Sequence, residues 1–164
     1  MAGERHAMFK GITAQRTVTV GKPRAEIYRF WRDLANLTFM EHIESVTVQD
    51  DKHSHWVAKG PAGKTLEWDA AIVKEVENER IEWEPVRGSD MIGGGLVLFK
   101  DAPGGRGTEV QVVLMYDPPA GEMGAAFAKL FGDNPSQMAR EDLRRFKQLL
   151  ETGEIPTING QPHG

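Results

Sequence analysis

TLEWDAAIVKEVENERIEW, residues 65–83, contains two runs of alternating apolar and polar side chains, one on each side of a turn. The turn is Glu77-Asn78-Glu79, short enough for a tight hairpin. The apolar members of the two runs stand two residues apart: Leu66, Trp68, Ala70 and Ile72, then Ile81 and Trp83. A period of two is typical of strands with one buried and one wet face. The stretch therefore predicts two antiparallel strands whose buried face carries tryptophan.

The same alternation continues on both sides of this hairpin. It returns in the last predicted strand, where the apolar residues are Val110, Val112, Leu114 and Tyr116. With Gly, Pro, Asp and Asn at the turns, the pattern predicts strands near residues 17–20, 43–49, 53–59, 65–77, 80–86, 91–100 and 107–116. Gly93-Gly94-Gly95 inside one of these strands indicates a bulge or a sharp bend. A bent sheet is what wrapping around a helix requires.

Helical periodicity appears at two places outside the sheet. After Pro23, an apolar face recurs at Ile27, Phe30, Trp31 and Leu34, and a break follows between residues 33 and 36. Near the end of the chain, a first helical face comprises Met123, Phe127, Leu130 and Phe131, interrupted at residues 132–135. A long helix then carries Met138, Leu143, Phe146, Leu149 and Leu150 and ends at Gly153. A sheet followed by one long helix predicts an α+β domain.

Composition limits the classes of function. The 164 residues carry a formal charge of −4, which argues against nucleic acid because phosphate binding needs a basic face. There is no cysteine, so disulfides, thiolate metal sites and a cysteine nucleophile are excluded. No apolar stretch approaches the length of a membrane span, and the first residues lack the apolar core of a signal peptide. We therefore expect a cytoplasmic protein with no membrane span.

One domain accounts for this length. Residues 1–11 are polar and broken by glycine, which predicts a loose arm. The domain itself is expected over residues 12–152, and residues 153–164 form an extended tail rich in proline and glycine.

The chain resembles the helix-grip superfamily shared by START lipid-transfer domains, birch-pollen-allergen-like proteins and polyketide cyclases/dehydrases (SRPBCC), and within it a bacterial cyclase/dehydrase-like group of uncharacterised function. The resemblance spans roughly residues 12–162 and rests on these stretches: residues 27–33, 39–46, 60–64 with 67–70, 80–83, 105–110, 116–119 and 142–147. It implies a curved antiparallel sheet wrapped around a long C-terminal helix. Such a fold hosts many functions, so the resemblance guides fold more than activity.

A hydrophobic or aromatic small molecule, lipid-like or polyketide-like, is the partner that this fold implies. The expected ligand cavity lies between sheet and helix and is lined by Phe39, Met40, Trp56, Trp68, Trp83, Leu96, Tyr116, Met123, Phe127 and Phe131. The alternative is that these side chains fill the core and leave no usable space. Residues 39–40 and 87–90 are the candidate gates of such a cavity.

A polyketide cyclase/dehydrase-type enzyme is the second hypothesis, with His42 or Tyr116 moving protons. No spaced acid–base set falls on the predicted cavity face: the pairs Glu67 with Asp69 and Glu82 with Glu84 alternate to the wet face. His53 and His55 also share that wet face, which favours a surface pair over a metal site. The charged residues of the last helix, among them Asp142 and Arg145, are interpreted as a solvated face.

The third hypothesis is a partner-binding module like the chaperone-activating and coenzyme-Q-binding branches of the same fold. An exposed apolar patch outside the cavity would distinguish it. No cofactor and no metal is expected on any of the three hypotheses. The sequence leaves the identity of the ligand and the oligomeric state open.

Overall fold

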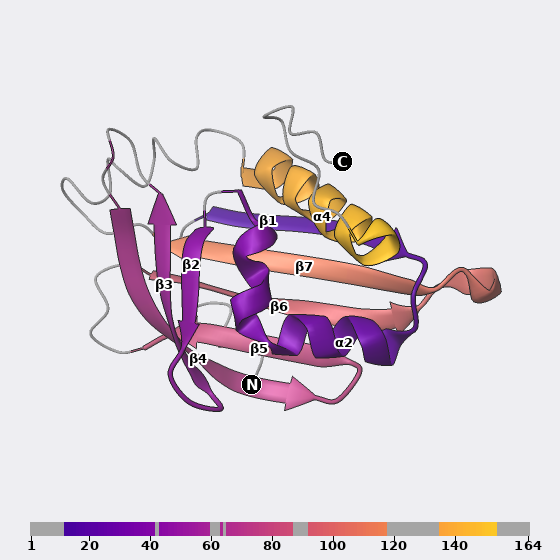
Figure 1. Ribbon diagram of the computed structural model, residues 1–164, viewed down its shortest axis with the longest axis horizontal. Helices are drawn as coiled ribbons and strands as arrows, with labels where there is room; N and C mark the ends of the chain where they lie inside the picture. The colour runs from indigo at the N-terminus through magenta and orange to yellow at the C-terminus, as the bar shows by residue number, and fades with distance from the viewer. Residues whose placement is uncertain are drawn as a thin grey trace.

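The computed structural model describes residues 12–41, 43–59, 63, 65–86, 92–117 and 135–153. Its elements follow the chain in this order: β1 (Ile12–Val20), α2 (Arg24–Arg32), the 3-10 helix η1 (Leu34–Phe39), β2 (Ile43–Val48), β3 (His53–Lys59), β4 (Thr65–Val76), β5 (Arg80–Pro85), β6 (Ile92–Asp101), the 3-10 turn η3 (Pro103–Gly105), β7 (Thr108–Asp117) and α4 (Pro135–Thr152). Figure 1 shows α2 and α4 on the same side of the sheet.

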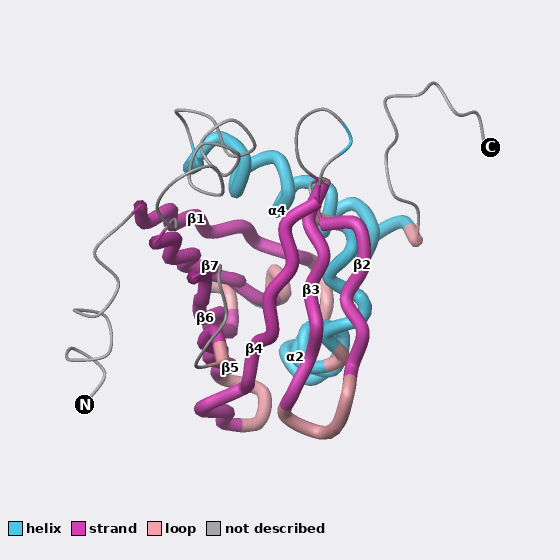
Figure 2. Tube along the Cα trace, turned by 90° about the vertical axis from the view of Figure 1, so that its left-hand side faces the viewer, coloured by secondary structure: helices cyan, strands magenta, loops and turns pink. Residues whose placement is uncertain are grey.

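Seven antiparallel strands form one sheet, in the order β1-β7-β6-β5-β4-β3-β2. The sheet curls, so that β2 and β3 stand apart from β1 and β7 (Figure 2). The predicted α+β fold, a curved antiparallel sheet around a C-terminal helix, is thereby confirmed. Strand β1 begins five residues before the predicted start, because the polar, exposed Gln15 and Arg16 interrupt the apolar alternation there.

Pairing register assigns the two faces of the sheet. Trp56 lies opposite Val46 on β2 and opposite Trp68 on β4, and Ile72 of β4 lies opposite Trp83 of β5. Because directly paired residues share a face, these side chains point to one side, which we call the inner face. The other side is the outer face. The inner-face residues join one buried cluster with Leu143 and Phe146 of α4, so the helix packs against the inner face.

Of the bulge or sharp bend predicted at Gly93-Gly94-Gly95, the bulge is wrong, and the sharp bend stays a prediction. The ladder between β6 and β7 runs without a shift through all three glycines, and the register shifts lie elsewhere, in the β2–β3 and β4–β5 ladders. Gly95 is explained by close approach instead: a Cβ there would lie 2.7 Å from the carbonyl oxygen of Val113 and 3.0 Å from Cζ2 of Trp83. A glycine lets the indole of Trp83 lie close against the backbone of β6.

Helices α2 and α4 bury apolar faces against the sheet. Pro23, with φ of −65°, precedes α2 and fixes the backbone for its first turn, and Ile27, Tyr28 and Trp31 are buried. The predicted end of α4 is confirmed, since Gly153 follows it in the left-handed region with φ of +79°. Within the described residues, neither helix is long and apolar enough to cross a membrane.

Polar contacts fix α4 near its C-terminus and near its middle. Near its C-terminus, the Glu151 carboxylate accepts the backbone N–H of Gly21 at 2.8 Å. The ammonium of Lys147 donates to the carbonyl oxygen of Thr19 at the end of β1. Near the middle of the helix, Arg145 donates to the Glu41 carboxylate at 2.9 Å. The helix is thus tied to the β1–α2 turn and to the segment between η1 and β2.

Candidate functional site

Three successive strands each place a buried tryptophan on the inner face. The Trp56 and Trp68 rings stack with centroids 6.0 Å apart and planes inclined by 16°. Trp83, on the next strand, packs over Gly95. All three indoles are more than nine-tenths buried, and they share the core cluster with Phe39 and Met40. The structure therefore brings together five of the ten predicted cavity residues.

Trp56 has its polar atom satisfied within its own strand. Its Nε1–H donates to the Ser54 hydroxyl at 2.9 Å, and both residues are buried. Residues two apart on a strand share a face, so the serine reaches the indole without any help from other elements. The tryptophan stack is consequently anchored at its β3 end by a local hydrogen bond.

A second aromatic group belongs to the helices. Trp31 of α2 meets the rings of Phe39 of η1 and Phe146 of α4 at centroid distances of 5.6 Å and 5.3 Å, both edge to face. Phe30 packs on the same two phenylalanines. Edge-to-face geometry is favourable for aromatic pairs beyond the area they bury. Helical spacing identified the apolar faces of Trp31 and Phe146, but not their meeting at Phe39.

Leu96 lies apart from the predicted cavity. It is buried, but it pairs with Glu82 and Val113, whereas its neighbour Val97 pairs with Ile81 on the inner face. Leu96 is therefore on the outer face, opposite to Trp83. In the apolar run of residues 96–99, alternation gives no face, and only the pairing register decides it.

The remaining predicted site residues fall outside what the structure describes. These are His42, Met123, Phe127, Phe131 and the side chain of Tyr116. The candidate gate at residues 87–90 lies outside it as well. Their roles in a cavity or in proton transfer remain predictions.

The carboxyl of Asp142 is buried, so the interpretation of this residue as part of a solvated face of α4 is wrong. It is 9% exposed, and its Oδ1 accepts both the backbone N–H of Glu41 at 3.1 Å and Nη1 of Arg145 at 2.8 Å. Burial raises the pKa of Asp142 to about 6, in spite of the lowering effects of these two partners. The signal was present in the sequence: Asp142 stands beside Leu143 and four residues before Phe146, on the apolar stripe of the helix.

Polar side chains of the outer face are tied to one another. His55 lies between Asp69 at 2.8 Å and Glu67 at 2.9 Å, and these hydrogen bonds raise the pKa of its imidazole. Glu82, expected in solvent, is only 3% exposed and pairs with Arg80. Across the described ranges, no group of three His, Cys, Asp or Glu side chains is arranged to hold a metal ion.

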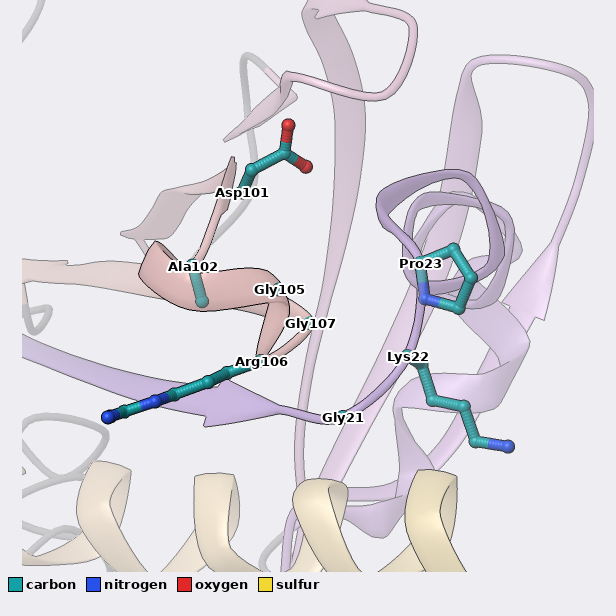
Figure 3. A pocket seen from close by; sticks show the side chains of 8 residues that line it. All are labelled: Gly21, Lys22, Pro23, Asp101, Ala102, Gly105, Arg106 and Gly107. Atoms are coloured by element: carbon teal, nitrogen blue, oxygen red, sulfur yellow. The ribbon is translucent and has the colours of Figure 1, made fainter.

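Among the described residues, two surface hollows are lined by turns and by the end of α2. One, of about 510 Å³, is lined by the turn after β1 and by the β6–β7 connection, including Lys22, Asp101 and Arg106. Figure 3 shows these three side chains pointing in different directions, so they do not converge on a common ligand. The other, of about 250 Å³, lies beside Arg32 and the β2–β3 turn. Neither hollow contains any of the predicted cavity residues.

Comparison with known proteins assigns this chain to a family. Residues 20–144, which form most of the chain, match the family described as polyketide cyclase / dehydrase and lipid transport. The chain belongs to that family. The resemblance found in the sequence is thereby confirmed, and the family as a whole is associated with hydrophobic ligands.

Several relatives of this polyketide cyclase/dehydrase family member share its length. A crystal structure of DR_A0006 from Deinococcus radiodurans is 39% identical, with 88% of this chain and all (100%) of that chain covered and a TM-score of 0.72. TTHA0849 from Thermus thermophilus shares the fold at 22% identity, 85% and 92% coverage and a TM-score of 0.60. An uncharacterised 17.2 kDa protein of Streptomyces lincolnensis is 26% identical over 141 residues, covering 84% of this chain and 88% of that protein.

Proposed function

We propose that this protein binds a hydrophobic or aromatic small molecule between the inner face of the sheet and α4. The observation that carries the proposal is the row of buried indoles from three successive strands, Trp56, Trp68 and Trp83. The family description, which includes lipid transport, supports the same class of ligand.

Indole rings suit this task because they present large, flat and rigid apolar surfaces. A planar ligand gains from both area burial and ring stacking, and the parallel Trp56–Trp68 pair offers the stacked geometry. Burying about 200 Å² of ligand surface is worth about 5 kcal/mol before the costs of association, at about 25 cal/mol per Å². Polar contacts and a larger buried area then have to supply the rest of a micromolar affinity.

Two measurements test the proposal. The first is mass spectrometry of small molecules released by denaturing protein purified from its native host; we expect a stoichiometric apolar compound. The second is the binding of 1-anilinonaphthalene-8-sulfonate, measured by the fluorescence of this probe. Trp68→Phe should weaken the binding of this probe, and His53→Gln on the outer face serves as the matched control. No released compound together with equal probe binding by both variants would contradict the proposal.

A cyclase/dehydrase-type activity is the second candidate, and Asp142 favours it. A buried carboxyl with a pKa of about 6 can both accept and donate a proton near neutral pH. The assay is deuterium exchange at the α-carbon of acetophenone, a slowly exchanging aryl ketone, followed by NMR. A rate that exceeds buffer and falls in Asp142→Asn supports this activity, whereas a rate equal to buffer argues against it.

The partner-binding hypothesis gains less support from the described surface. The large hydrophobic residues that are exposed there are three valines, Val48, Val73 and Val76, from β2 and β4. Single exposed apolar residues are ordinary in folded proteins.

A further inference from the structure

Among the residues that the structure describes, the indole nitrogen of Trp31 has no hydrogen-bond partner. Trp31 is 1% exposed, and its Nε1–H meets no acceptor among the described residues. An indole N–H can only donate, so it is satisfied by an acceptor or not at all. Buried polar groups in folded proteins are nearly always paired, and each exception calls for a physical explanation.

Trp56 provides a contrast, because its indole N–H does have an acceptor. Trp56 reaches the Ser54 hydroxyl two residues away on its own strand. Trp31 is surrounded instead by Phe39 and Phe146, whose rings meet it edge to face at 5.6 Å and 5.3 Å. Phenylalanine has no oxygen or nitrogen on its side chain to accept the proton. The rings from η1 and α4 therefore pack against the indole without offering an acceptor, and no other described residue offers one.

We propose that Trp31 is a specificity-determining residue that donates its Nε1–H to a neutral oxygen acceptor on the bound molecule. This inference rests on the proposed function, since it assigns a polar contact to the same ligand. The acceptor is a carbonyl or ether oxygen rather than a hydroxyl, because a hydroxyl would bring its own buried donor among phenylalanine rings. A carboxylate is excluded because an uncompensated charge is still more costly to bury there.

The ligand class that follows is an aromatic compound carrying a carbonyl group, such as an aryl ketone or a quinone. Its rings would pack against the aromatic side chains of the inner face, and its oxygen would accept the indole N–H of Trp31, for which the described part of the chain supplies no acceptor. The acceptor fixes which way round the molecule enters, which stacking on indole faces alone does not do.

Fluorene and 9-fluorenone form a matched pair of probes, since they share one tricyclic shape and differ by the carbonyl. Their dissociation constants are measured by equilibrium dialysis with the full-length protein. We expect the wild-type protein to bind 9-fluorenone about five- to tenfold more tightly than fluorene, the range of one net hydrogen bond. Trp31→Phe should reduce that ratio to about one. Incorporating 3-benzothienylalanine at position 31 keeps the bicyclic shape, replaces N–H by sulfur and should have the same effect.

Trp56→Phe is the control, because it removes an indole whose N–H already has an acceptor. This variant can weaken both probes together, but it should keep the preference for 9-fluorenone. A spectroscopic readout complements the affinities: the chain has four tryptophans, and the indole ¹⁵N–¹H signal that disappears in Trp31→Phe identifies Trp31. That signal should move downfield with 9-fluorenone and stay in place with fluorene.

The outcomes separate this inference from the proposed function. Equal affinity of the wild-type protein for the two probes overturns the role of Trp31 and leaves small-molecule binding intact. A preference for 9-fluorenone that survives in the benzothienylalanine variant also overturns it, since another donor must then serve the carbonyl. Binding of neither probe overturns both the inference and the aromatic ligand on which it rests.

Discussion

Asp142→Asn should make this protein more stable at neutral pH, although it removes a charge that is paired with Arg145. Burial raises the pKa of the Asp142 carboxyl from 3.8 to about 6, and the attraction of Arg145 is already included in that result. The folded environment therefore favours the neutral carboxyl over the charged one. Asparagine is neutral at every pH, and its side-chain oxygen can still accept the N–H of Glu41 and the Arg145 donor.

The sign and size of the effect follow from proton linkage. Because the folded pKa lies above the unfolded one, the stability that Asp142 contributes is fully present below pH 3.8 and is lost as the pH rises through about 6. A difference of about two units corresponds to about 3 kcal/mol, at about 1.4 kcal/mol per unit. We expect Asp142→Asn to raise the free energy of unfolding by about 2–3 kcal/mol at pH 7.5 and to change it little at pH 4.

Urea denaturation followed by tryptophan fluorescence at pH 4, 5, 6 and 7.5 measures the difference directly. Glu44→Gln on β2 is the matched control, an exposed carboxylate whose loss should change stability by a few tenths of a kcal/mol at any of these pH values. A variant less stable than the wild type at pH 7.5, or a difference that does not grow between pH 4 and 7.5, would refute the reasoning. The attraction between Asp142 and Arg145 would then outweigh the cost of burying the charge.

Three further substitutions test other parts of the fold. Arg32, Lys52 and Tyr28 lower the pKa of Glu75 to about 2, so the charged carboxylate stabilises the folded protein at neutral pH. Glu75→Gln should therefore lower the free energy of unfolding by about 1–2 kcal/mol at pH 7, a value that allows for solvent screening. Urea denaturation should show this loss disappearing as the pH falls toward 2. Gly95→Ala should cost about 1–3 kcal/mol and alter the near-ultraviolet circular dichroism of the tryptophans, whereas an unchanged spectrum would contradict the close approach of Trp83 to β6. Phe146→Ala should cost about 3–5 kcal/mol in thermal or urea unfolding, and a loss below about 1 kcal/mol would mean that α4 does not anchor the core.

The sheet could be predicted from sequence because its signal is local and periodic. Trp68 and Trp83 alternate with charged residues on both sides, so each strand reveals its buried face without knowledge of its neighbours. Register then needs only short hairpin turns, such as the one at Asn78, whose positive φ of 64° suits asparagine. Strands β2 to β7 pair in chain order, as neighbours joined by turns do, whereas the pairing of β1 with β7 was not predicted from the sequence.

The errors occurred where one residue type occupies both faces or where charge was read as exposure. Leu96 belongs to a run in which every residue is apolar, so alternation could not separate it from Val97. Glu82 alternates to the outer face as predicted, but Arg80 pairs with it and it is buried there. Asp142 was counted among the polar positions of α4 although helical spacing places it on the apolar stripe. A sequence pattern indicates the face on which a side chain lies, whereas the burial of that side chain depends on what packs against that face.

The hydrogen bonding of Trp56 depends on a residue close in the sequence, whereas that of Trp31 depends on residues far apart in it. The acceptor of Trp56 is two residues away, so a Ser-x-Trp sequence in a strand is enough to predict the hydrogen bond of this indole. The surroundings of Trp31 come from residues 39 and 146, which meet only once α4 has packed across η1. A donor whose neighbours come from two other segments, η1 and α4, has its surroundings set by the fold as a whole. A substitution that shifts Phe39 or Phe146 should therefore move the indole ¹⁵N–¹H signal of Trp31, as a bound ligand does. The signal of Trp56 should not move, because its acceptor lies on its own strand.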